Sequence, residues 1–345
     1  MRFDTVVGGE TGHPVGHADM ARQARTGERL GYGGIHVTEL THDAFVSATV
    51  VALATERVEV GTQIAVALAR NPMTVAVAAR DLQDLSGGRF SLGLGTQVAA
   101  HITRRFSMPF SHPAERMAEF IGAVRAIWRS WQTGERLDFR GEYYQHTLMT
   151  PAFSPGPAPH GLPPIQLAAV GERMARTAGA HADGVLVHAF ATPRYLAEVL
   201  LPAIERGLGD AGRERAGFVV SGPPFVVSGA TDADRERAAA RVRSQLAFYG
   251  STPAYRGVLA LHDRGDLADR LHELSVSREP DAWSRMAALI DDEVLAEFAV
   301  IAEPEGVLPE IRRRYRGLLD RAAVAAPDGV AAARWAELLR EAADR

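Results

Sequence analysis

Short apolar runs alternate along this chain with segments in which apolar residues recur every three or four positions. The runs are rich in Val, Ile and Leu, which is typical of parallel strands buried on both faces. They lie at 3–8, 34–39, 58–66, 90–97, 165–170, 184–190, 218–228 and 298–302. The segments between them predict helices over 17–30, 42–55, 72–86, 113–132, 172–182 and 193–207, and a helical region from 231 to about 292.

Residues 57–97 show the repeating unit most clearly, because two strands there bracket one helix. Pro72 suits the first turn of that helix, and Gly87 with Gly88 supplies the left-handed stop that a helix end favours. Gly61 and Gly93 lie in the two strands. Such small residues indicate a close approach of the backbone to something flat, and a planar cofactor is the candidate.

Eight strands alternating with helices predict a closed parallel (β/α)8 barrel, in which the loops after the strands build the active site. Two segments, about 135–164 and 248–280, break the alternation and are expected to be insertions that form lids or rim structure. The amphipathic run 329–344 predicts an extra helix outside the barrel. We therefore expect residues 1–345 to form a single domain.

Composition removes several classes of chemistry. All 38 basic residues are arginine, and the chain has no cysteine. A lysine Schiff base, a phosphate loop ending in lysine, a thiolate nucleophile and a cysteine-rich zinc site are therefore excluded. The net charge of −4 is spread over both signs, which argues against nucleic acid as a partner. The apolar runs are of strand length, so we expect a cytoplasmic protein without a membrane span.

The residues that end the predicted strands should form a ring around one mouth of the barrel. Their types suit binding of a heterocycle with a phosphate tail better than hydrolysis. Candidates for proton transfer are Glu39, His42 and His101, and candidates for cofactor binding are Gln63, Ile64, Thr96, Gln97, Val170, Gly171 and His188.

Two of the histidines have a second interpretation. His42 either caps the following helix or reaches into the mouth, and His101 either contacts an anion or substrate or is simply solvated. A metal site is not expected. His13 and His17 stand four apart, but Pro14 and Gly16 make a shared helix face improbable, and no carboxylate-containing metal motif occurs.

Two glycine patterns also have alternatives. Gly93 and Gly95 suggest a dinucleotide fingerprint, but Val98 stands where its third glycine would be. Gly171 precedes helix 172–182, whose free backbone N–H groups attract an anion such as phosphate. The other interpretation of Gly171 is a simple turn.

Several motifs of this chain resemble those of the bacterial luciferase-like superfamily and, within it, the deazaflavin (coenzyme F420)-dependent oxidoreductases. The resemblance covers about residues 1–322. The motifs that carry it are Gly61-Thr62-Gln63-Ile64, Arg70-Asn71-Pro72, Leu85-Ser86-Gly87-Gly88-Arg89, Leu92-Gly93-Leu94-Gly95, Leu167-Ala168-Ala169-Val170-Gly171 and Ala182-Asp183-Gly184.

The resemblance implies a TIM barrel whose third strand bulges at a cis peptide, here Gln63–Ile64, that supports the cofactor ring. It also implies that Glu39 lies near the ring, that Ala169, Val170 and Gly171 lie along the coenzyme tail, and that the protein is a homodimer acting on a small molecule.

The chain departs from the sugar-phosphate dehydrogenases of that family at two positions. Leu40 follows Glu39 where those enzymes have histidine, and Val98 replaces an acidic residue. Oxidation of a sugar phosphate is therefore not expected, and the sequence does not name another substrate.

Three functions follow from the residues and the resemblance. The first is an oxidoreductase that transfers hydride between coenzyme F420 and a small organic substrate. The second is an FMN-dependent monooxygenase on the same barrel, because flavin activates oxygen and deazaflavin does not. The third, of a different class, is a non-catalytic flavin-binding protein.

Overall fold

The computed structural model describes residues 1–345 except 11–12, 278 and 344–345. Within this part of the chain, eight parallel strands close a barrel, because β10 pairs with β7 on one side and with β11 on the other. The predicted TIM barrel is thereby confirmed. In sheet order the strands are β1 (Arg2–Val7), β4 (Gly34–Val37), β5 (Glu59–Thr62), β7 (Phe90–Gly95), β10 (Ile165–Ala169), β11 (Gly184–Val187), β12 (Val219–Gly222) and β15 (Arg321–Ala323).

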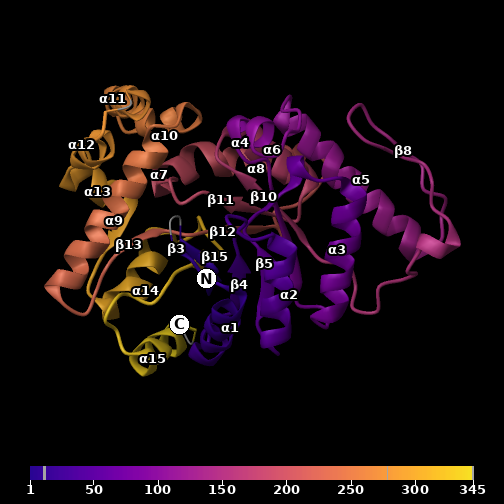
Figure 1. The fold of residues 1–345 in the computed structure, drawn as a ribbon, viewed down its shortest axis with the longest axis horizontal. Helices are drawn as coiled ribbons and strands as arrows, with labels where there is room; N and C mark the ends of the chain where they lie inside the picture. Colours follow the sequence, from indigo (N-terminus) through magenta and orange to yellow (C-terminus); the bar gives the residue numbers. More distant parts are fainter. Residues whose placement is uncertain (11–12, 278, 344–345) are drawn as a thin grey trace.

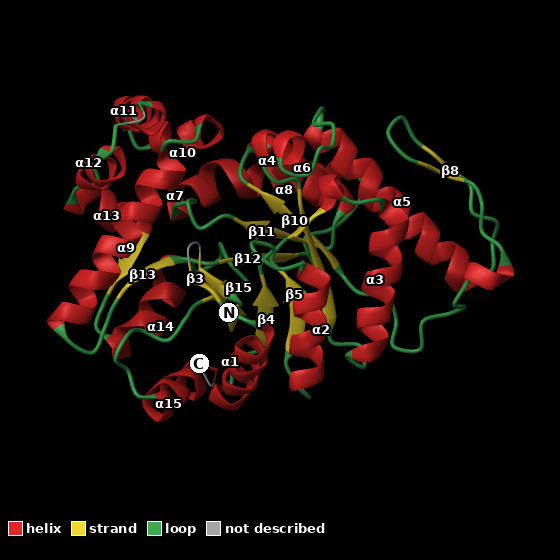
Figure 2. Cartoon of the chain, in the orientation of Figure 1, coloured by secondary structure: helices red, strands yellow, loops and turns green. Residues whose placement is uncertain are grey.

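Helices surround the barrel (Figures 1 and 2). Those that connect its strands are α1 (His17–Leu30), α2 (Ala44–Ala54), α3 (Pro72–Leu85), α4 (Ala99–Arg104), α5 (Pro113–Thr133), α6 (Glu172–His181), α7 (Pro193–Tyr195), α8 (Leu201–Asp210) and α14 (Pro304–Arg314). The core lies between helices and strands. Trp128 of α5 is buried there, and its Nε1–H donates to the carbonyl of Ala76 in α3 at 3.0 Å, so the predicted apolar stripe of this helix packs inward.

The last barrel strand is not where the apolar pattern predicts it. The run at 298–302 forms β14 (Ala299–Ile301), which pairs with β13 (Phe225–Val227) outside the barrel. The position between β12 and β1 is taken instead by β15. The predicted strand 218–228 is likewise divided, because Pro223 and Pro224 separate β12 from β13 and proline cannot continue a ladder.

Charged side chains fill the barrel near the amino ends of its strands. Nε of Arg321 lies 2.6 Å from Oδ2 of Asp4, and Nη1 lies 2.6 Å from Oε1 of Glu59. Burial acts to raise the pKa of Asp4, but His36 and Arg321 outweigh it and lower that pKa to about 2. Gly61 makes room for this group, since a Cβ there would lie 2.5 Å from Nδ1 of His36. The amino end of the barrel is thus packed with paired charges.

The first predicted insertion, 135–164, runs along the outside of α5. It contains a hairpin, β8 (Phe139–Arg140) and β9 (Gln145–His146), seen at the right of Figure 1, and the 3₁₀ turn Pro151–Phe153. The carboxylate of Glu119 in α5 accepts the backbone N–H groups of Glu142 and Tyr143, each at 2.8 Å. These bonds fasten the hairpin turn to the helix.

The second insertion belongs to a group of short helices at the left of Figure 1. These are α9 (Asp232–Gly250), α10 (Arg256–Leu261), α11 (Gly265–Val276), α12 (Ala282–Ala288) and α13 (Asp292–Phe298). Although 248–280 lacks a clear pattern, most of it is therefore helical. The predicted C-terminal helix is α15 (Ala332–Ala343), which packs against α1 and α14 outside the barrel. A small hairpin, β2 (Gly9–Glu10) with β3 (His13–Pro14), follows β1.

Candidate active site

A bulge after β5 brings Gln63 and Ile64 to the carboxyl end of the barrel. Gly61 pairs with Ser91, a separation of 30 residues, whereas Ala65 of β6 (Ala65–Val66) pairs with Leu94, a separation of 29. One extra residue is therefore inserted in this strand, as the resemblance implies. The Gln63–Ile64 peptide is cis, which is also as expected.

Gln63 carries an unused acceptor at this bulge. Its backbone N–H donates to the carbonyl of Val37 at 2.7 Å, which ties the bulge to β4. Its side-chain Oε1 is buried and has no hydrogen-bond partner among the described residues. Because a buried polar atom without a partner is costly, this oxygen is available to a donor from a bound molecule.

Glu39 follows β4 and is buried against the same bulge. Its Oε2 accepts the N–H of Val66 at 2.7 Å and Nη1 of Arg70 at 2.6 Å. Arg70 also donates from Nη2 to Oδ2 of Asp43 at 2.5 Å. Burial acts to lower the pKa of Arg70, but its bonds to the two carboxylates prevail and raise it. Glu39 and Asp43 are thus both ion-paired with Arg70.

Gly93 and Gly95 serve packing within the protein, which corrects the expectation that they approach a cofactor. A Cβ at Gly93 would lie 1.9 Å from the carbonyl oxygen of Thr62, and one at Gly95 would lie 2.9 Å from Cγ1 of Ile64. Thr62 Oγ1 bonds both polar groups of Gly93, at 2.7 and 3.0 Å. The absence of a side chain at the two glycines therefore leaves room for the bulged strand and not for a ligand.

Gly171 is different, because no heavy atom would lie within 4 Å of a Cβ added there. It is the N-cap of α6 in an extended conformation, with φ −103°, and follows Ala169 and Val170 at the end of β10. A side chain added at Gly171 would therefore meet open space at the start of α6. This placement suits the anion-binding interpretation of Gly171.

His188 follows β11 and lies within an aromatic group. Its ring centroid is 4.4 Å from that of Tyr249 and 5.0 Å from that of Tyr255. Its Nδ1 accepts the N–H of Phe190 at 3.1 Å. Burial lowers the pKa of His188 to about 4, so the ring is neutral at neutral pH and its hydrogen is on Nε2.

His42 does not cap α2, since Asp43 does so by accepting the N–H groups of Phe45 and Val46 at 2.8 and 3.1 Å. The ring of His42 instead lies 4.3 Å from that of His17, the first residue of α1. Nε2 of His17 is buried without a partner in the described chain. The two imidazoles therefore form a pair between the ends of β1 and β4.

Thr96, Gln97 and His101 follow β7. Thr96 and Gln97 are partly exposed, and Gln97 has a left-handed backbone with φ 60°. His101 is exposed on α4, a helix that the sequence analysis does not predict. The segment after α4 returns to the rim, where Nη2 of Arg105 donates to the carbonyl of Leu40 at 2.9 Å.

Four residues of this site are missing from the sequence-based candidates: Arg70, Asp43, Tyr249 and Tyr255. Arg70 lies in a quoted motif, but nothing local indicates that its partner is Glu39, 31 residues away. Tyr249 and Tyr255 belong to the segment without a clear pattern, and only their aromatic character was a signal.

Two cavities lie away from this rim. One of about 550 Å³ is bounded by α5 and the start of β10, and one of about 490 Å³ lies between α14 and α15. Within the described residues, no cluster of three His, Asp or Glu side chains could hold a metal ion. Over that same part of the chain, each helix is too short or too polar to cross a membrane.

The family model described as luciferase-like monooxygenase matches residues 1–321. This chain belongs to the luciferase-like family. The family comprises enzymes, and its barrel is the one described above. The resemblance inferred from the motifs is therefore confirmed.

Relatives within the family include F420-dependent enzymes. "Uncharacterized protein Rv1360" of Mycobacterium tuberculosis is 50% identical over 85% of this chain and 86% of the relative. The 5,10-methylenetetrahydromethanopterin reductase of Archaeoglobus fulgidus is 26% identical over 81% of this chain and 80% of the relative. The F420-dependent glucose-6-phosphate dehydrogenase of Nocardia farcinica is 34% identical, but over 46% of each chain.

Solved structures of an F420-dependent reductase and of a monooxygenase show the same fold. The coenzyme F420 dependent tetrahydromethanopterin reductase from Methanopyrus kandleri has a TM-score of 0.76 at 19% identity, covering 98% of this chain and 96% of that chain. The long-chain alkane monooxygenase LadA has a TM-score of 0.72 at 12% identity, covering 100% and 91%. The fold alone therefore does not distinguish the two chemistries.

Proposed function

We propose that this protein is an oxidoreductase that transfers hydride between coenzyme F420 and a small organic substrate. The observation that carries the proposal is the rim formed by the bulge at Gln63–Ile64 and the open start of α6 at Gly171. A relative that matches most of the chain is a reductase. A relative that matches about half of it is a dehydrogenase named as F420-dependent. Deazaflavin supplies a carbon centre that carries hydride without activating oxygen.

The polar groups of the rim fit a flat heterocycle with an anionic tail. The buried Oε1 of Gln63 lacks a donor in the described chain and would accept a ring N–H. Nε2–H of neutral His188 is a donor for a ring or substrate oxygen. Ala169, Val170 and Gly171 would lie along the tail, where the N–H groups of α6 favour a phosphate. Thr96 and Gln97 would line the opposite side.

Glu39 acts in this proposal mainly by holding the bulge. It bonds Val66 directly and Arg70 by an ion pair, so its carboxylate fixes the chain that follows Ile64. A proton for the substrate comes from His42 or His101. His42 is the better placed of the two, since it belongs to the rim loop after β4 and contacts His17.

The substrate in this proposal is uncharged where it meets β4 and β7. Leu40 and Val98 stand at the two positions that separate this chain from the sugar-phosphate dehydrogenases, and both side chains are exposed. Apolar side chains there offer no partner to a phosphate group. The proposal therefore does not extend to sugar phosphates.

We infer that the protein works as a homodimer joined through α2 and α3. Every residue of α2 is apolar or a small hydroxyl residue, and a helix that is apolar all round is normally covered. Val46 and Leu53 of α2 and Val77 and Leu85 of α3 are nevertheless exposed in the single chain. A second copy is the occupant that would cover them.

Titration of the purified protein with F420 and with FMN tests the choice of coenzyme. F420 is expected to bind in the micromolar range or tighter, followed through its fluorescence, and FMN is expected to bind far more weakly. Reduced F420 should then be consumed with an organic acceptor without oxygen. Tight FMN binding with no response to F420 would instead establish a monooxygenase, and firm binding without turnover would favour a carrier.

A further inference from the structure

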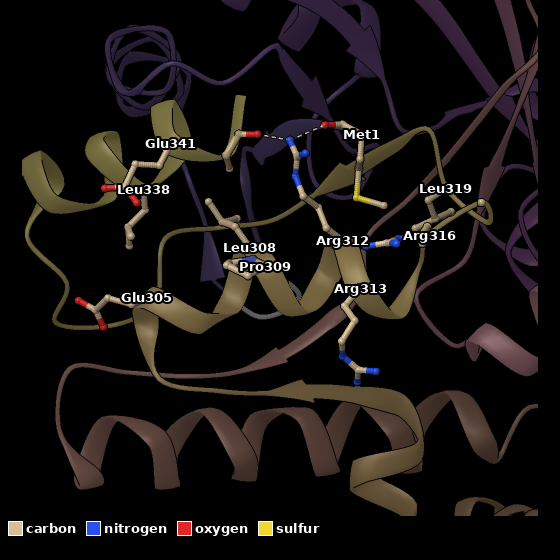
Figure 3. A pocket seen from close by; sticks show the side chains of 12 residues that line it. Met1, Glu305, Leu308, Pro309, Arg312, Arg313, Arg316, Leu319, Leu338 and Glu341 are labelled. Atoms are coloured by element: carbon tan, nitrogen blue, oxygen red, sulfur yellow. Dashed lines mark hydrogen bonds between the residues drawn. The ribbon is translucent and has the colours of Figure 1, made fainter. Parts of the chain in front are cut away.

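The cavity between α14 and α15 lies near the amino ends of β1 and β15, away from the strand ends that build the rim (Figure 3). Its volume of about 490 Å³ is within the range of small-molecule sites. Leu308 of α14 and Leu338 of α15 line its walls, and Met1 and Leu319 close one end. The cavity therefore offers a ligand both apolar walls and charged side chains.

Arg312 reaches from α14 to this closed end and has no carboxylate partner among the described residues. Its Nη2 donates to the carbonyl of Met1 at 3.2 Å and to that of Ala342, and its guanidinium carbon lies 5.4 Å from the ring centroid of Phe3. Its Nε is buried without a hydrogen-bond partner among the described residues. A partly buried cation held only by carbonyls and a ring is incompletely compensated, so an anion beside it would be favoured.

Arg316 adds a second cation at the same end. It is exposed, lines the cavity, and makes no ion pair or hydrogen bond with the described part of the chain. Arg313, near the end of α14, also lines the cavity but differs in its pairing. It pairs with Glu310 at 2.6 Å and points away from α15 (Figure 3).

The acidic residues of the cavity lie toward the opposite end (Figure 3). Glu305 is 3.3 Å from Nε of Arg334, and Glu341 is 4.0 Å from Nη1 of the same residue. Arg334, which does not line the cavity, is shared by these two carboxylates and by that of Glu337, 3.1 Å from its Nη1, so this end of the cavity keeps a net negative charge. Among the described residues, the unpaired arginines of the cavity, Arg312 and Arg316, lie at the end beside Met1.

We propose that this cavity binds a monocarboxylic acid with a hydrocarbon tail. The carboxylate lies between Arg312 and Arg316, whose N–H groups form charge-assisted hydrogen bonds to it. The tail lies on Leu308 and Leu338 and is removed from water there. The bound acid joins α14, α15 and the start of β1, and it occupies a site separate from the coenzyme rim.

Isothermal titration calorimetry of the full chain with octanoate tests this site. Octanol serves as the probe without charge, and inorganic phosphate as the anion without a tail. Octanoate is expected to bind saturably and at least tenfold more tightly than either probe. Arg316→Met should weaken octanoate binding at least tenfold, and Arg313→Met, a matched control at an arginine already paired with Glu310, should change it less than twofold. Both arginines are exposed, so neither variant should lose its fold.

Five results would overturn the proposal. Octanol binding as tight as octanoate would leave only an apolar groove, and phosphate binding as tight as octanoate would leave only a surface anion site. An equal loss of octanoate affinity in Arg316→Met and Arg313→Met would show that Arg316 does not bind the carboxylate. No saturable heat at all would show that the cavity does not bind octanoate. A fourth titration, with F420 and FMN present, should give the same octanoate affinity. Competition with either coenzyme would place octanoate at the rim instead.

Discussion

Single side chains at the rim act through partners that are far away in the sequence. Arg70 joins Glu39 and Asp43 because β4 and the bulge of β5 are neighbours in the barrel. The sequence indicates Glu39 as a strand-end acid, but it gives no sign that an arginine already pairs with it. The aromatic surroundings of His188 are hidden for the same reason, since Tyr249 and Tyr255 come from a distant segment.

Replacing Glu39 with Gln keeps the size of the side chain and removes its charge. We expect turnover to fall at least tenfold and the free energy of unfolding to fall by about 3 kcal/mol, because the buried guanidinium of Arg70 loses a partner. Steady-state kinetics and urea denaturation measure the two effects. Asp43→Asn, which alters the more exposed partner of Arg70 and keeps the helix cap, should change both less. Unchanged turnover in Glu39→Gln would remove this residue from the mechanism.

His188 should make stability depend on pH. Its pKa in the folded chain is about 4, below the ordinary 6.5. Between pH 4 and 6.5 the unfolded chain therefore binds a proton at this residue and the folded chain does not. Stability is therefore fully present above about pH 6.5 and is lost as the pH falls toward 4, by up to about 3 kcal/mol. Urea denaturation at pH 7, 5.5 and 4.5 should show a smaller loss in His188→Asn than in the parent. Equal losses would contradict this assignment.

At the scale of elements, local signals predict those helices and strands that carry a regular apolar pattern. They fail for β15, which has three residues and begins with Arg321, a charged residue that points into the barrel to meet Asp4. They fail equally for β14, whose apolar residues belong to a pair of strands outside the barrel. Strand position depends on pairing with distant partners, and a short run does not contain that information.

The start of α6 provides a test in which stability and affinity move in opposite directions. Gly171→Asp should stabilise the helix slightly, because aspartate is a better N-cap than glycine and the site has room for it. The same charge should weaken F420 binding at least tenfold by repelling its phosphate. Gly171→Asn provides the matched cap without charge and should retain affinity within about threefold. Fluorescence titration measures the F420 affinity and thermal unfolding measures the stability. Equal affinities in the two variants would show that the phosphate does not bind at the start of α6.

For the whole molecule, the barrel and its open rim could be predicted from the motifs and from seven correctly placed strands, because a long alternation of buried parallel strands and helices has few other solutions. The helical character of 231–292 could also be predicted, but its division into α9 to α13 and the course of 135–164 along α5 could not. Their anchors are scattered contacts, such as Glu119 with the hairpin turn, that follow no period. The substrate is undetermined for the same reason, since these variable segments shape what surrounds the barrel.

Association of two chains is the prediction that belongs to this scale. Leu53→Arg places a charge on the exposed apolar face of α2 and is expected to yield monomers in sedimentation velocity experiments at micromolar concentration. Val276→Arg on α11 alters a residue of similar exposure, 62% against 69%, outside the proposed interface and should leave dimers intact. Dimers of the same stability in both variants would show that α2 and α3 do not form the interface.

A crystal structure of the protein with F420 tests the placement of the coenzyme most directly. We expect the ring to lie on the bulge at Gln63 and Ile64, with Oε1 of Gln63 accepting a ring N–H and the phosphate at the N–H groups that follow Gly171. A ring bound elsewhere on the chain, or crystals that take up FMN and not F420 at the rim, would contradict the proposed function.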